Sequence, residues 1–488
     1  MQSITPDRMK AIDTNCTHLG LKGIQLMENA GAAIARKVLS LDVHNNVLIV
    51  AGRGNNGGDA FVAARHLSYY DNIRVRVVLA GKASGIGTKD ALENFNLLKH
   101  CGIKGLAEIT DSTQSDVFQW FKEADVIVDG LLGTGIRGHV REPEATLIDA
   151  INTGNSYVVA VDTPSGLNPA TGEGENTVMA DTTLTFHRMK TGLENQGEFT
   201  GDVEIINIGV CRDAEDTVNR GDLEPLLKRH IDSHKGQSGR VLIIGGGLYY
   251  GAPALSAMAA LRTGADIVTI ASPANVSDTI ASFSPNLIVR KLSSDILHTN
   301  DIEILKDLIH AHDVVVIGMG LGNEEAIRQA VNQILPLCKK VVVDADALNK
   351  LQLPPPENCE MILTPHSGEL ARLTGKEVEK ELPARAKMLQ DFSRENKIIT
   401  VLKGKTDIIS DGRYIRKNDS GNAGMSVGGT GDVLAGIVGA LFCRTDAFNA
   451  ACCGAFVNGE AGDVAFAKKG YGLLATDVIE HITDIMKQ

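Results

Sequence analysis

Short apolar runs recur along the chain, and each is followed by a longer segment with the residue spacing of a helix. In the first half these runs are 47–50, 75–79, 124–128 and 157–161. Short runs rich in valine and isoleucine, separated by helical segments, are typical of buried parallel strands. The pattern therefore predicts an open, mostly parallel α/β sheet.

The same alternation begins again in the second half of the chain. Between the two series lies a charged, glycine- and histidine-bearing stretch from 213 to 238, where we place the interdomain connection. A chain of 488 residues exceeds the size at which one hydrophobic core usually stops growing. We expect two domains, residues 1–225 and 226–488. The apolar runs of the second series are 240–247, 267–270, 314–317, 341–344, 361–364 and 398–402.

Composition narrows the class of protein. The chain is 43% hydrophobic, contains 51 glycines and carries a formal net charge of −12. That charge disfavours binding to nucleic acid or to anionic membranes, so we expect neither as a partner. The eight cysteines form no CxxC pair, which favours reduced, mostly buried thiols over a zinc site or a disulfide framework. No leader-like or membrane-length apolar run occurs, so we expect a cytoplasmic enzyme.

A glycine-rich loop follows the first apolar run. Its segment 52–57 has the G-x-G-x-x-G spacing of a dinucleotide-binding turn, in which helix N-terminal N–H groups hold a phosphate. The next run ends at 78–81 without the acidic residue that binds an adenosine ribose, which weakens a conventional NAD-binding assignment. Asn55, Asn56 and Asp59 suit a site for a phosphate together with a cation. A plain strand-to-helix turn with an Asx cap is the alternative.

Two more loops follow strands of the first half. Segment 129–139 contains its own G-x-G-x-x-G, and Asp162 comes directly after the run 157–161. An acid or base at a strand end faces a crevice in an open sheet, so we expect Asp162 to act on a substrate. The alternative is that Asp162 caps the turn formed by Pro164 and Ser165.

The three loops, in this order, resemble the signatures of the NAD(P)H-hydrate epimerase domain. The resemblance implies catalytic roles for Asp162 and Lys190, and a potassium ion held by Asn56, Asp129 and Ser165, whose oxygen atoms suit a hard cation. For Lys190 a solvated surface position is the alternative. The resemblance implies that the hydrated nucleotide is contacted by Asn55, Asn56, Gly57, Gly58, Asp59, Gly133, Thr134, Gly135, Ile136, Arg137, Gly138, His139 and Asp162.

A further glycine-rich loop, 428–431, precedes an apolar helix near the end of the chain. Its free N–H groups are placed to hold a phosphoryl group. Asp432 then lies in the first helical turn, where it either favours the positive helix terminus or removes a proton from a substrate hydroxyl. Segments 318–322, 344–349, 364–369 and 403–407 follow other strands and favour one continuous cleft at their carboxyl ends.

His366 lies three residues before Glu369 in one of these segments. Two such residues are too few for a metal site. We therefore expect His366 to form a hydrogen bond to substrate, with a buried structural histidine as the alternative.

Residues 235 to about 478 resemble the ATP- or ADP-dependent NAD(P)H-hydrate dehydratase domain, which has the ribokinase-like fold. The implied reaction transfers a phosphoryl group to the C6 hydroxyl of the hydrated ring and then eliminates it, with Mg²⁺ and ADP or ATP as donor. The resemblance implies that Ala252, Gly320, His366 and Asp432 contact the hydrated cofactor, with Asp432 catalytic. It implies that the adenine nucleotide is bound by Lys403, Gly404, Lys405, Thr406, Asp407 and Gly431.

Together these features predict an α/β protein with a Rossmann-like N-terminal open sheet and a ribokinase-like C-terminal α/β domain. The predicted function is repair of nicotinamide nucleotides: epimerisation of the R and S forms of hydrated NADH and NADPH, and dehydration of the S form. The alternative is a ribokinase-like small-molecule kinase fused to a non-catalytic nucleotide-binding module. Base rates favour a homo-oligomer.

Overall fold

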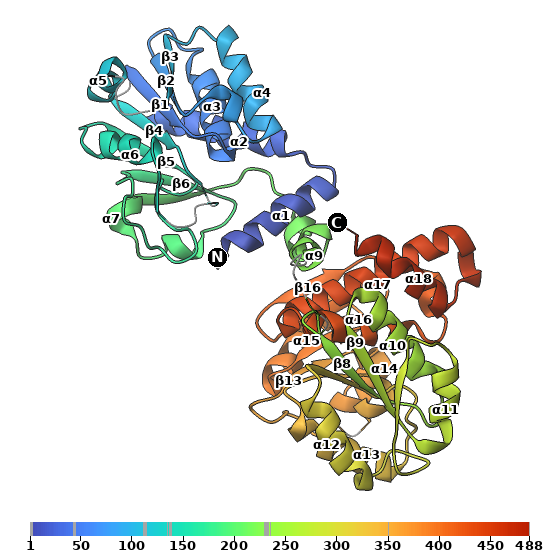
Figure 1. Ribbon diagram of the computed structural model, residues 1–488. Helices are drawn as coiled ribbons and strands as arrows, with labels where there is room; N and C mark the ends of the chain where they lie inside the picture. Colours follow the sequence, from blue (N-terminus) through green and yellow to red (C-terminus); the bar gives the residue numbers. More distant parts are fainter. Residues whose placement is uncertain are drawn as a thin grey trace. The chain divides into compact units, whose positions relative to one another are not determined.

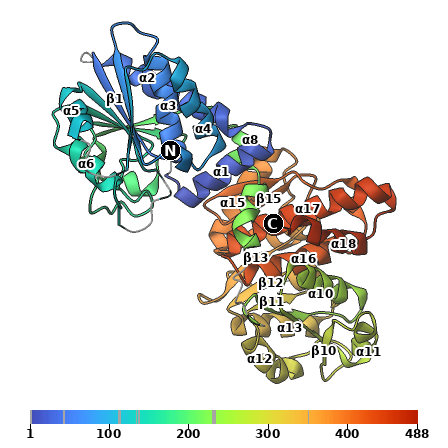
Figure 2. The same ribbon diagram turned by 45° about the horizontal axis from the view of Figure 1, so that its top comes forward.

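The chain forms two compact units, Met1–Ala214 and Glu215–Gln488, and Figures 1 and 2 show their elements from two directions. The computed structural model describes residues 3–41, 45–110, 115–133, 135, 139–228, 234, 236–349 and 351–487. The units divide earlier in the chain than residue 225, because the intervening segment binds the second unit: Arg416 contacts Asp222 at 3.0 Å. Assignment of the two activities to 1–225 and 226–488 remains a prediction.

The first unit contains a seven-stranded sheet whose strands all run parallel, in the order β3-β2-β1-β4-β5-β6-β7. The order reverses between β1 and β4, and ligands bind at such a switch point in open α/β sheets. Its strands are β1 (Asn46–Ala51), β2 (Arg74–Ala80), β3 (Gly105–Ile109), β4 (Val126–Gly130), β5 (Tyr157–Val161), β6 (Thr182–Phe186) and β7 (Asp202–Ile206).

Helices cover both faces of this sheet. Residues of α2, α3 and α4 pack on one face, and residues of α5 and α6 pack on the other. Helix α1 is fixed by the segment before it, where Ile4 N–H donates to Met189 O at 2.8 Å and Thr191 N–H donates to Ile4 O at 3.0 Å. The helices are α1 (Pro6–His18), α2 (Gly23–Ser40), α3 (Asn55–Leu67), α4 (Lys89–Leu97), α5 (Ser115–Glu123), α6 (Glu144–Asn152), α7 (Gly197–Thr200) and α8 (Arg212–Asp216).

The second unit contains a nine-stranded sheet in the order β10-β9-β8-β11-β12-β13-β14-β15-β16. The first seven strands of this order run parallel, and β15 and β16 extend the sheet as antiparallel strands. Its switch point lies between β8 and β11. The strands are β8 (Arg240–Ile244), β9 (Ile267–Ser272), β10 (Ile288–Lys291), β11 (Val314–Ile317), β12 (Lys340–Val343), β13 (Glu360–Leu363), β14 (Ile399–Leu402), β15 (Asp407–Ser410) and β16 (Ile415–Asn418).

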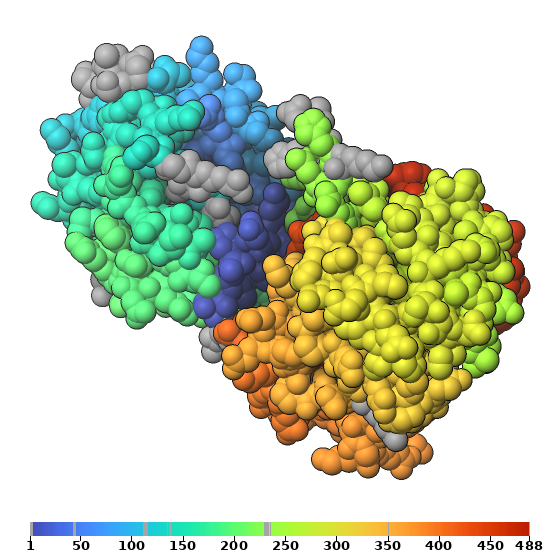
Figure 3. All heavy atoms as spheres, turned by 60° about the horizontal axis from the view of Figure 1, so that its bottom comes forward, coloured from blue at the N-terminus to red at the C-terminus, as the bar shows by residue number. Residues whose placement is uncertain are grey.

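Two helical layers enclose this second sheet. Residues of α10, α16, α17 and α18 pack on one face, and residues of α12 and α13 pack on the other. The surface of α12 and α13, coloured yellow, faces the reader in Figure 3. The helices are α9 (Arg220–Leu227), α10 (Gly251–Thr263), α11 (Ala274–Ser282), α12 (Ile302–His310), α13 (Glu325–Ile334), α14 (Ser367–Thr374), α15 (Leu382–Asn396), α16 (Thr430–Phe442), α17 (Ala447–Lys469) and α18 (Ala475–Ile485).

The predicted fold class is confirmed, because each unit is built on a mostly parallel sheet covered by helices on both faces. The apolar runs named from the sequence coincide with strands of these sheets. In the described part of the chain, no helix is long and apolar enough to cross a membrane.

Close backbone contact between α10 and α16 makes Gly436 sensitive to substitution. A Cβ added there would lie 2.0 Å from Ser256 O, far below a normal contact distance. We expect Gly436→Ala to lower the free energy of unfolding by roughly 1–3 kcal/mol, because packed helix backbones move little. Thermal and denaturant unfolding measure the effect. Gly472→Ala is the matched control, since nothing lies within 4 Å of its added Cβ, and equal stability of the two variants would contradict the prediction.

Candidate active sites

Two glycine loops of the first unit touch each other at the carboxyl edge of its sheet. A Cβ added to Gly52, after β1, would lie 1.8 Å from Leu131 O, after β4. A Cβ added to Gly57 would lie 2.0 Å from Gly52 O. Glycine is therefore required for the loops to meet. Gly54 is the N-cap of α3 and makes no side-chain cap bond, so the alternative of a plain Asx-capped turn is wrong.

The third loop brings Asp162 against Lys190. Asp162 has a positive φ of 62°, and its Oδ1 accepts hydrogen bonds from Phe186 N–H at 2.9 Å, from the Thr185 hydroxyl and from Lys190 Nζ. The Lys190 ammonium also donates to Phe186 O at 2.9 Å, and its side chain is 0% exposed. A solvated surface position for Lys190 is therefore wrong. Asp162 binds β6 residues and Lys190, so turn capping does not account for its side chain.

A cavity of about 680 Å³ opens beside this ion pair. Helices α1, α2 and α3 contribute to its wall together with the strand ends. The predicted residues that line it are Asn55, Asn56, Asp59, Gly135, Asp162 and Lys190. The structure thus brings the glycine loop, the proposed acid or base and the buried lysine to one cavity.

The other predicted substrate contacts of this unit are placed differently. Gly133 lines a neighbouring cavity of about 420 Å³, which shares Asn55, Asn56 and Gly135 with the first. Gly57 and Gly58 are buried in the first turn of α3, whereas the exposed His139 pairs with Glu175 at 2.7 Å. Four predicted contacts lie outside the described residues: Thr134, Ile136, Arg137 and Gly138.

Two further carboxyl groups that line the cavity have raised pKa values. Asp59 is buried, and desolvation together with the charges of Asp162 and Asp13 raises its pKa well above the usual range. The same causes, desolvation first and then Asp162, raise the pKa of Asp13 to about 7, with Lys190 opposing. Sequence reasoning missed Asp13. The available signal was a polar residue beside the buried apolar positions Met9, Ile12 and Cys16 of one helix.

The three residues predicted to hold potassium lie together beneath the loops. Ser165 donates from its hydroxyl to Asp129 Oδ1 at 2.6 Å and from its backbone N–H to Oδ2 at 2.8 Å. Asn56 Nδ2 donates to Val161 O at 2.8 Å.

Asp129 is fully buried, and burial raises its pKa to about 6 although Ser165 and Leu131 donate to it. Among the described residues, no cationic side chain pairs with Asp129. A buried carboxylate surrounded by neutral oxygen-bearing groups fits a hard monovalent cation.

In the second unit, the segments that follow β8, β11, β12 and β13 lie at the carboxyl edge of the sheet and are joined by backbone hydrogen bonds. Gly246 N–H donates to Met319 O at 2.8 Å, and Tyr249 N–H donates to Gly320 O at 3.3 Å. A Cβ added to Gly320 would lie 2.1 Å from Tyr249 O. The two predicted substrate contacts Gly320 and Ala252, at the start of α10, therefore belong to adjoining segments.

Lys403 is the electrostatic centre of this edge. Its ammonium pairs with Asp344 Oδ1 at 2.9 Å and lies 4.0 Å from Glu369 Oε2. Desolvation lowers the pKa of Lys403, but the carboxylates of Asp344 and Glu369 outweigh it and raise the pKa above the usual value. A Cβ added to Gly431 would lie 3.3 Å from Lys403 Nζ, so the glycine loop meets this cation. The sequence analysis named the segment 344–349 as part of the cleft but did not select Asp344 as a site residue.

Asp432 occupies the first turn of α16, as predicted. Desolvation raises its pKa to about 7, Asp344 and Asp346 add to the increase, and Lys403 opposes it. A carboxyl group that titrates near neutrality is suited to removing a proton from a hydroxyl and later releasing it.

His366 is the N-cap of α14 and accepts a hydrogen bond from Gly368 N–H at 3.0 Å. Its side chain is 55% exposed, so the alternative of a buried structural histidine is wrong.

Two residues of the predicted nucleotide-binding loop make internal contacts. Asp407 accepts hydrogen bonds from Gly404 N–H at 3.0 Å and from Asn418 Nδ2 at 3.0 Å, and the Thr406 hydroxyl donates to Asp419 at 2.6 Å. These bonds shape the loop. Lys405 is exposed beside them.

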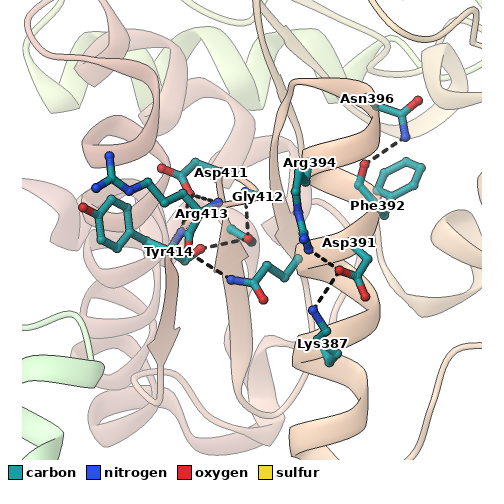
Figure 4. Close-up of polar contacts among 11 residues, drawn as sticks. Lys387, Asp391, Phe392, Arg394, Asn396, Asp411, Gly412, Arg413 and Tyr414 are labelled. Atoms are coloured by element: carbon teal, nitrogen blue, oxygen red, sulfur yellow. Dashed lines mark hydrogen bonds and ion pairs between the residues drawn. The ribbon is translucent and has the colours of Figure 1, made fainter. Parts of the chain in front are cut away.

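A cavity of about 610 Å³ near α15 and β15 contains none of the predicted site residues. Polar residues at and beside this cavity bond to one another, as Figure 4 shows. Asp391 pairs with Lys387 at 2.9 Å and with Arg394, and Asp411 accepts from Arg413 N–H at 2.8 Å and from Tyr414 N–H at 2.6 Å. We therefore assign no site to it.

Comparison with known proteins covers both units. A family model described as NAD(P)H-hydrate dehydratase matches residues 241–484, and one described as YjeF-related protein N-terminus matches residues 23–192. The bifunctional NAD(P)H-hydrate repair enzyme Nnr of Archaeoglobus fulgidus is 44% identical over 488 residues, which span 99% of this chain and 98% of that protein. The enzyme of the same name from Pyrobaculum aerophilum is 40% identical and covers 100% of this chain and 99% of its own.

A solved structure also resembles the chain. It is the ADP/ATP-dependent NAD(P)H-hydrate dehydratase from Bacillus subtilis, co-crystallised with ATP/Mg²⁺. The identity is 27%, the TM-score is 0.48, and the match covers 53% of this chain and 92% of the other.

The two Nnr relatives match both units along nearly their whole length, and the predicted motifs lie at the sheet edges where the sites form. The chain belongs to the family of bifunctional NAD(P)H-hydrate repair enzymes.

Proposed function

We propose that this chain repairs hydrated nicotinamide nucleotides by two reactions, epimerisation at C6 in the first unit and nucleotide-dependent dehydration in the second. The observation that carries the proposal is that one chain contains two sites, each with a candidate catalytic carboxyl group near a lysine. The first has Asp162 and buried Lys190 at a cavity, and the second has Asp432 in the first turn of α16 near Lys403. The substrates are hydrated NADH and NADPH, with ADP or ATP as phosphoryl donor.

In the second unit, Asp432 removes the proton of the C6 hydroxyl, and the hydroxyl oxygen attacks the terminal phosphoryl group. Lys403 and the free N–H groups at the start of α16 balance the charge that develops on the transferred group. Phosphate is then a good leaving group, and its elimination restores the ring double bond. His366 and Gly320 contact the hydrated cofactor.

Mg²⁺ bound to the nucleotide phosphates would neutralise part of their charge. Asp344 and Asp346 are the carboxylates that would hold it, since magnesium proteins often use one or two carboxylates together with substrate phosphates. In the described part of the chain, no group of three or more histidine, cysteine, aspartate or glutamate side chains is arranged to hold a metal ion. A site that depends on the nucleotide fits this arrangement.

In the first unit, Asn55 and Asn56 at the start of α3 bind the anionic part of the nucleotide, and Asp162 serves the hydrated ring. Potassium held by Asn56, Asp129 and Ser165 would fix the two loops by compensating the Asp129 carboxylate. A cytoplasmic location and a homo-oligomeric state remain predictions.

The primary test incubates the purified chain with hydrated NADH, Mg²⁺ and either ATP or ADP, with a sample lacking nucleotide as control. We expect the near-ultraviolet absorbance of NADH to return only with nucleotide. Recovery beyond the S fraction, faster than spontaneous epimerisation, reports the first unit. Accumulation of a stable phosphorylated product would instead support a small-molecule kinase.

We expect Asp432→Asn to slow dehydration by roughly 10²–10⁴-fold, the range for loss of a positioned base. Nucleotide affinity, measured by calorimetry, stays near the wild-type value because Lys403 and the α16 N–H groups remain. Glu395→Gln, an exposed change on α15, is the control. Turnover of Asp432→Asn close to that control would remove Asp432 from the catalytic role.

The dehydration rate should also depend on pH. Asp432 acts only when ionised, and its pKa in the free protein is about 7. We therefore expect kcat/KM for the S hydrate to fall as the pH drops below about 7, because the protonated fraction of Asp432 rises. Rate profiles at saturating nucleotide measure this limb. Its persistence in the residual activity of Asp432→Asn would assign the limb to another group.

The Lys190–Asp162 pair predicts a double-mutant cycle. Lys190→Met leaves a buried carboxylate without its cation and Asp162→Asn leaves a buried cation, so each should destabilise the unit by about 3–5 kcal/mol. The double variant should lose less than the sum of the two, because neither charge remains. All three should lose epimerase activity. Denaturant unfolding and chromatographic separation of the epimers give the measurements, and additive losses of stability would show that the pair is not coupled.

A further inference from the structure

The walls of the first cavity are more acidic than a dinucleotide site requires. Five carboxyl groups and two amines line it: Asp7, Lys10, Asp13, Asp59, Asp90, Asp162 and Lys190. The phosphates of the substrate carry negative charge, so these five carboxyl groups do not serve to bind them. Carboxylates stabilise positive charge that develops during a reaction. The lining therefore fits a cationic species formed at the ring.

Asp13 and Asp162 reach this cavity from different elements. Asp162 comes from the sheet edge and is held through Oδ1 by Phe186 and Lys190. Asp13 comes from α1, which the Ile4 backbone bonds to Met189 and Thr191 fix beside the Lys190 segment. The two carboxyl groups are close enough for Asp162 to perturb the Asp13 pKa. The matched family model begins at residue 23, beyond Asp13.

Epimerisation at C6 requires groups on both faces of the ring. The hydroxyl leaves from one face and must be replaced on the other, so a proton is donated on one side and accepted on the other. One carboxyl group at a single position cannot serve both faces. A pair from separate elements, Asp13 on α1 and Asp162 at the end of β5 beside Lys190, meets this requirement.

We propose that Asp13 is a further catalytic residue of the epimerase, and that Asp13 and Asp162 exchange the C6 hydroxyl through a ring cation. This inference rests on the proposed epimerase function. Protonated Asp13 donates its proton to the C6 hydroxyl, and the C6–O bond breaks with its electron pair leaving on water. The lone pair of N1 forms the N1=C6 bond of the cation.

A second water then adds to the opposite face of the ring. Its oxygen forms the new C6–O bond, its proton passes to the Asp162 carboxylate, and the electron pair of the N1=C6 bond returns to N1. One water has replaced another, and one proton has moved from Asp13 to Asp162. Proton exchange with cavity water resets the pair, and the reverse reaction uses the same groups in opposite roles.

The test measures epimerisation of the purified R hydrate by the full chain without nucleotide, so that dehydration does not occur. We expect Asp13→Asn to lower the rate by roughly 10²–10⁴-fold and Asp13→Glu to recover part of it. Glu93→Gln on α4, exposed and outside the cavity lining, is the control and should match wild type. Nucleotide-dependent dehydration of the S hydrate and thermal unfolding, measured on each variant, show whether the protein remains folded.

Wild-type epimerisation in water labelled with heavy oxygen tests the exchange step itself. We expect one labelled oxygen at C6 of each epimerised molecule by mass spectrometry, above an enzyme-free sample. Retention of the original oxygen would overturn the exchange and indicate ring opening, and a folded Asp13→Asn variant as fast as the control would overturn the role of Asp13. If wild type itself fails to speed epimerisation, the proposed function fails instead.

Discussion

Both sites depend on backbone segments approaching more closely than side chains permit. In the first unit the carbonyl of Leu131 occupies the space a Cβ of Gly52 would need, and in the second Tyr249 O does the same for Gly320. Each contact joins elements next to a switch point, where the sheet order reverses and strand-end loops diverge. The glycines let those loops and helix N-termini converge, and the polar side chains of each site are positioned by that convergence.

Convergence at a sheet edge also creates the electrostatics of the sites. Loops that meet closely exclude water, and this desolvation raises the pKa of Asp432 to about 7 and that of Asp129 to about 6. Lys190 and Lys403 each sit beside a carboxylate in these surroundings, at Asp162 and Asp344. Buried ion pairs add little stability compared with apolar packing. Their value here is chemical, since each holds one carboxylate beside a cation while neighbouring carboxyl groups have raised pKa values.

Much of the fold follows from the apolar runs, because a central parallel strand is buried on both faces and its sequence is continuously apolar. The strands that the pattern missed lack this feature. Edge strand β3 alternates in exposure, and the exposed edge strand β10 includes Arg290 and Lys291. Strand β6, with the sequence TTLTF, is buried but rich in threonine, so the search for apolar runs did not detect it. The antiparallel strands β15 and β16 have the sequences DIIS and IRKN, whose polar and charged residues leave no continuous apolar run.

The site residues also differ in how far the local sequence reveals them. Some are identified by their neighbours in the sequence, and others only by the tertiary structure. Motif residues such as Asn56, Asp162 and Asp432 can be identified from the sequence, because they stand next to glycines or at the ends of apolar runs. The structure places them at strand ends or helix starts, as predicted. The burial of Lys190 cannot be predicted from the sequence, since the residue type does not distinguish a buried lysine from an exposed one.

Asp13 illustrates the limit most clearly. It stands on a helix separated from the motifs by the whole of α2 and β1. Contacts far along the chain bring it to the cavity: Ile4 pairs with the Lys190 segment, and Asn15 Nδ2 donates to Ala214 O. A catalytic group supplied in this way leaves no local pattern in the sequence. Its relevance becomes apparent only when the charge balance of the cavity is considered as a whole.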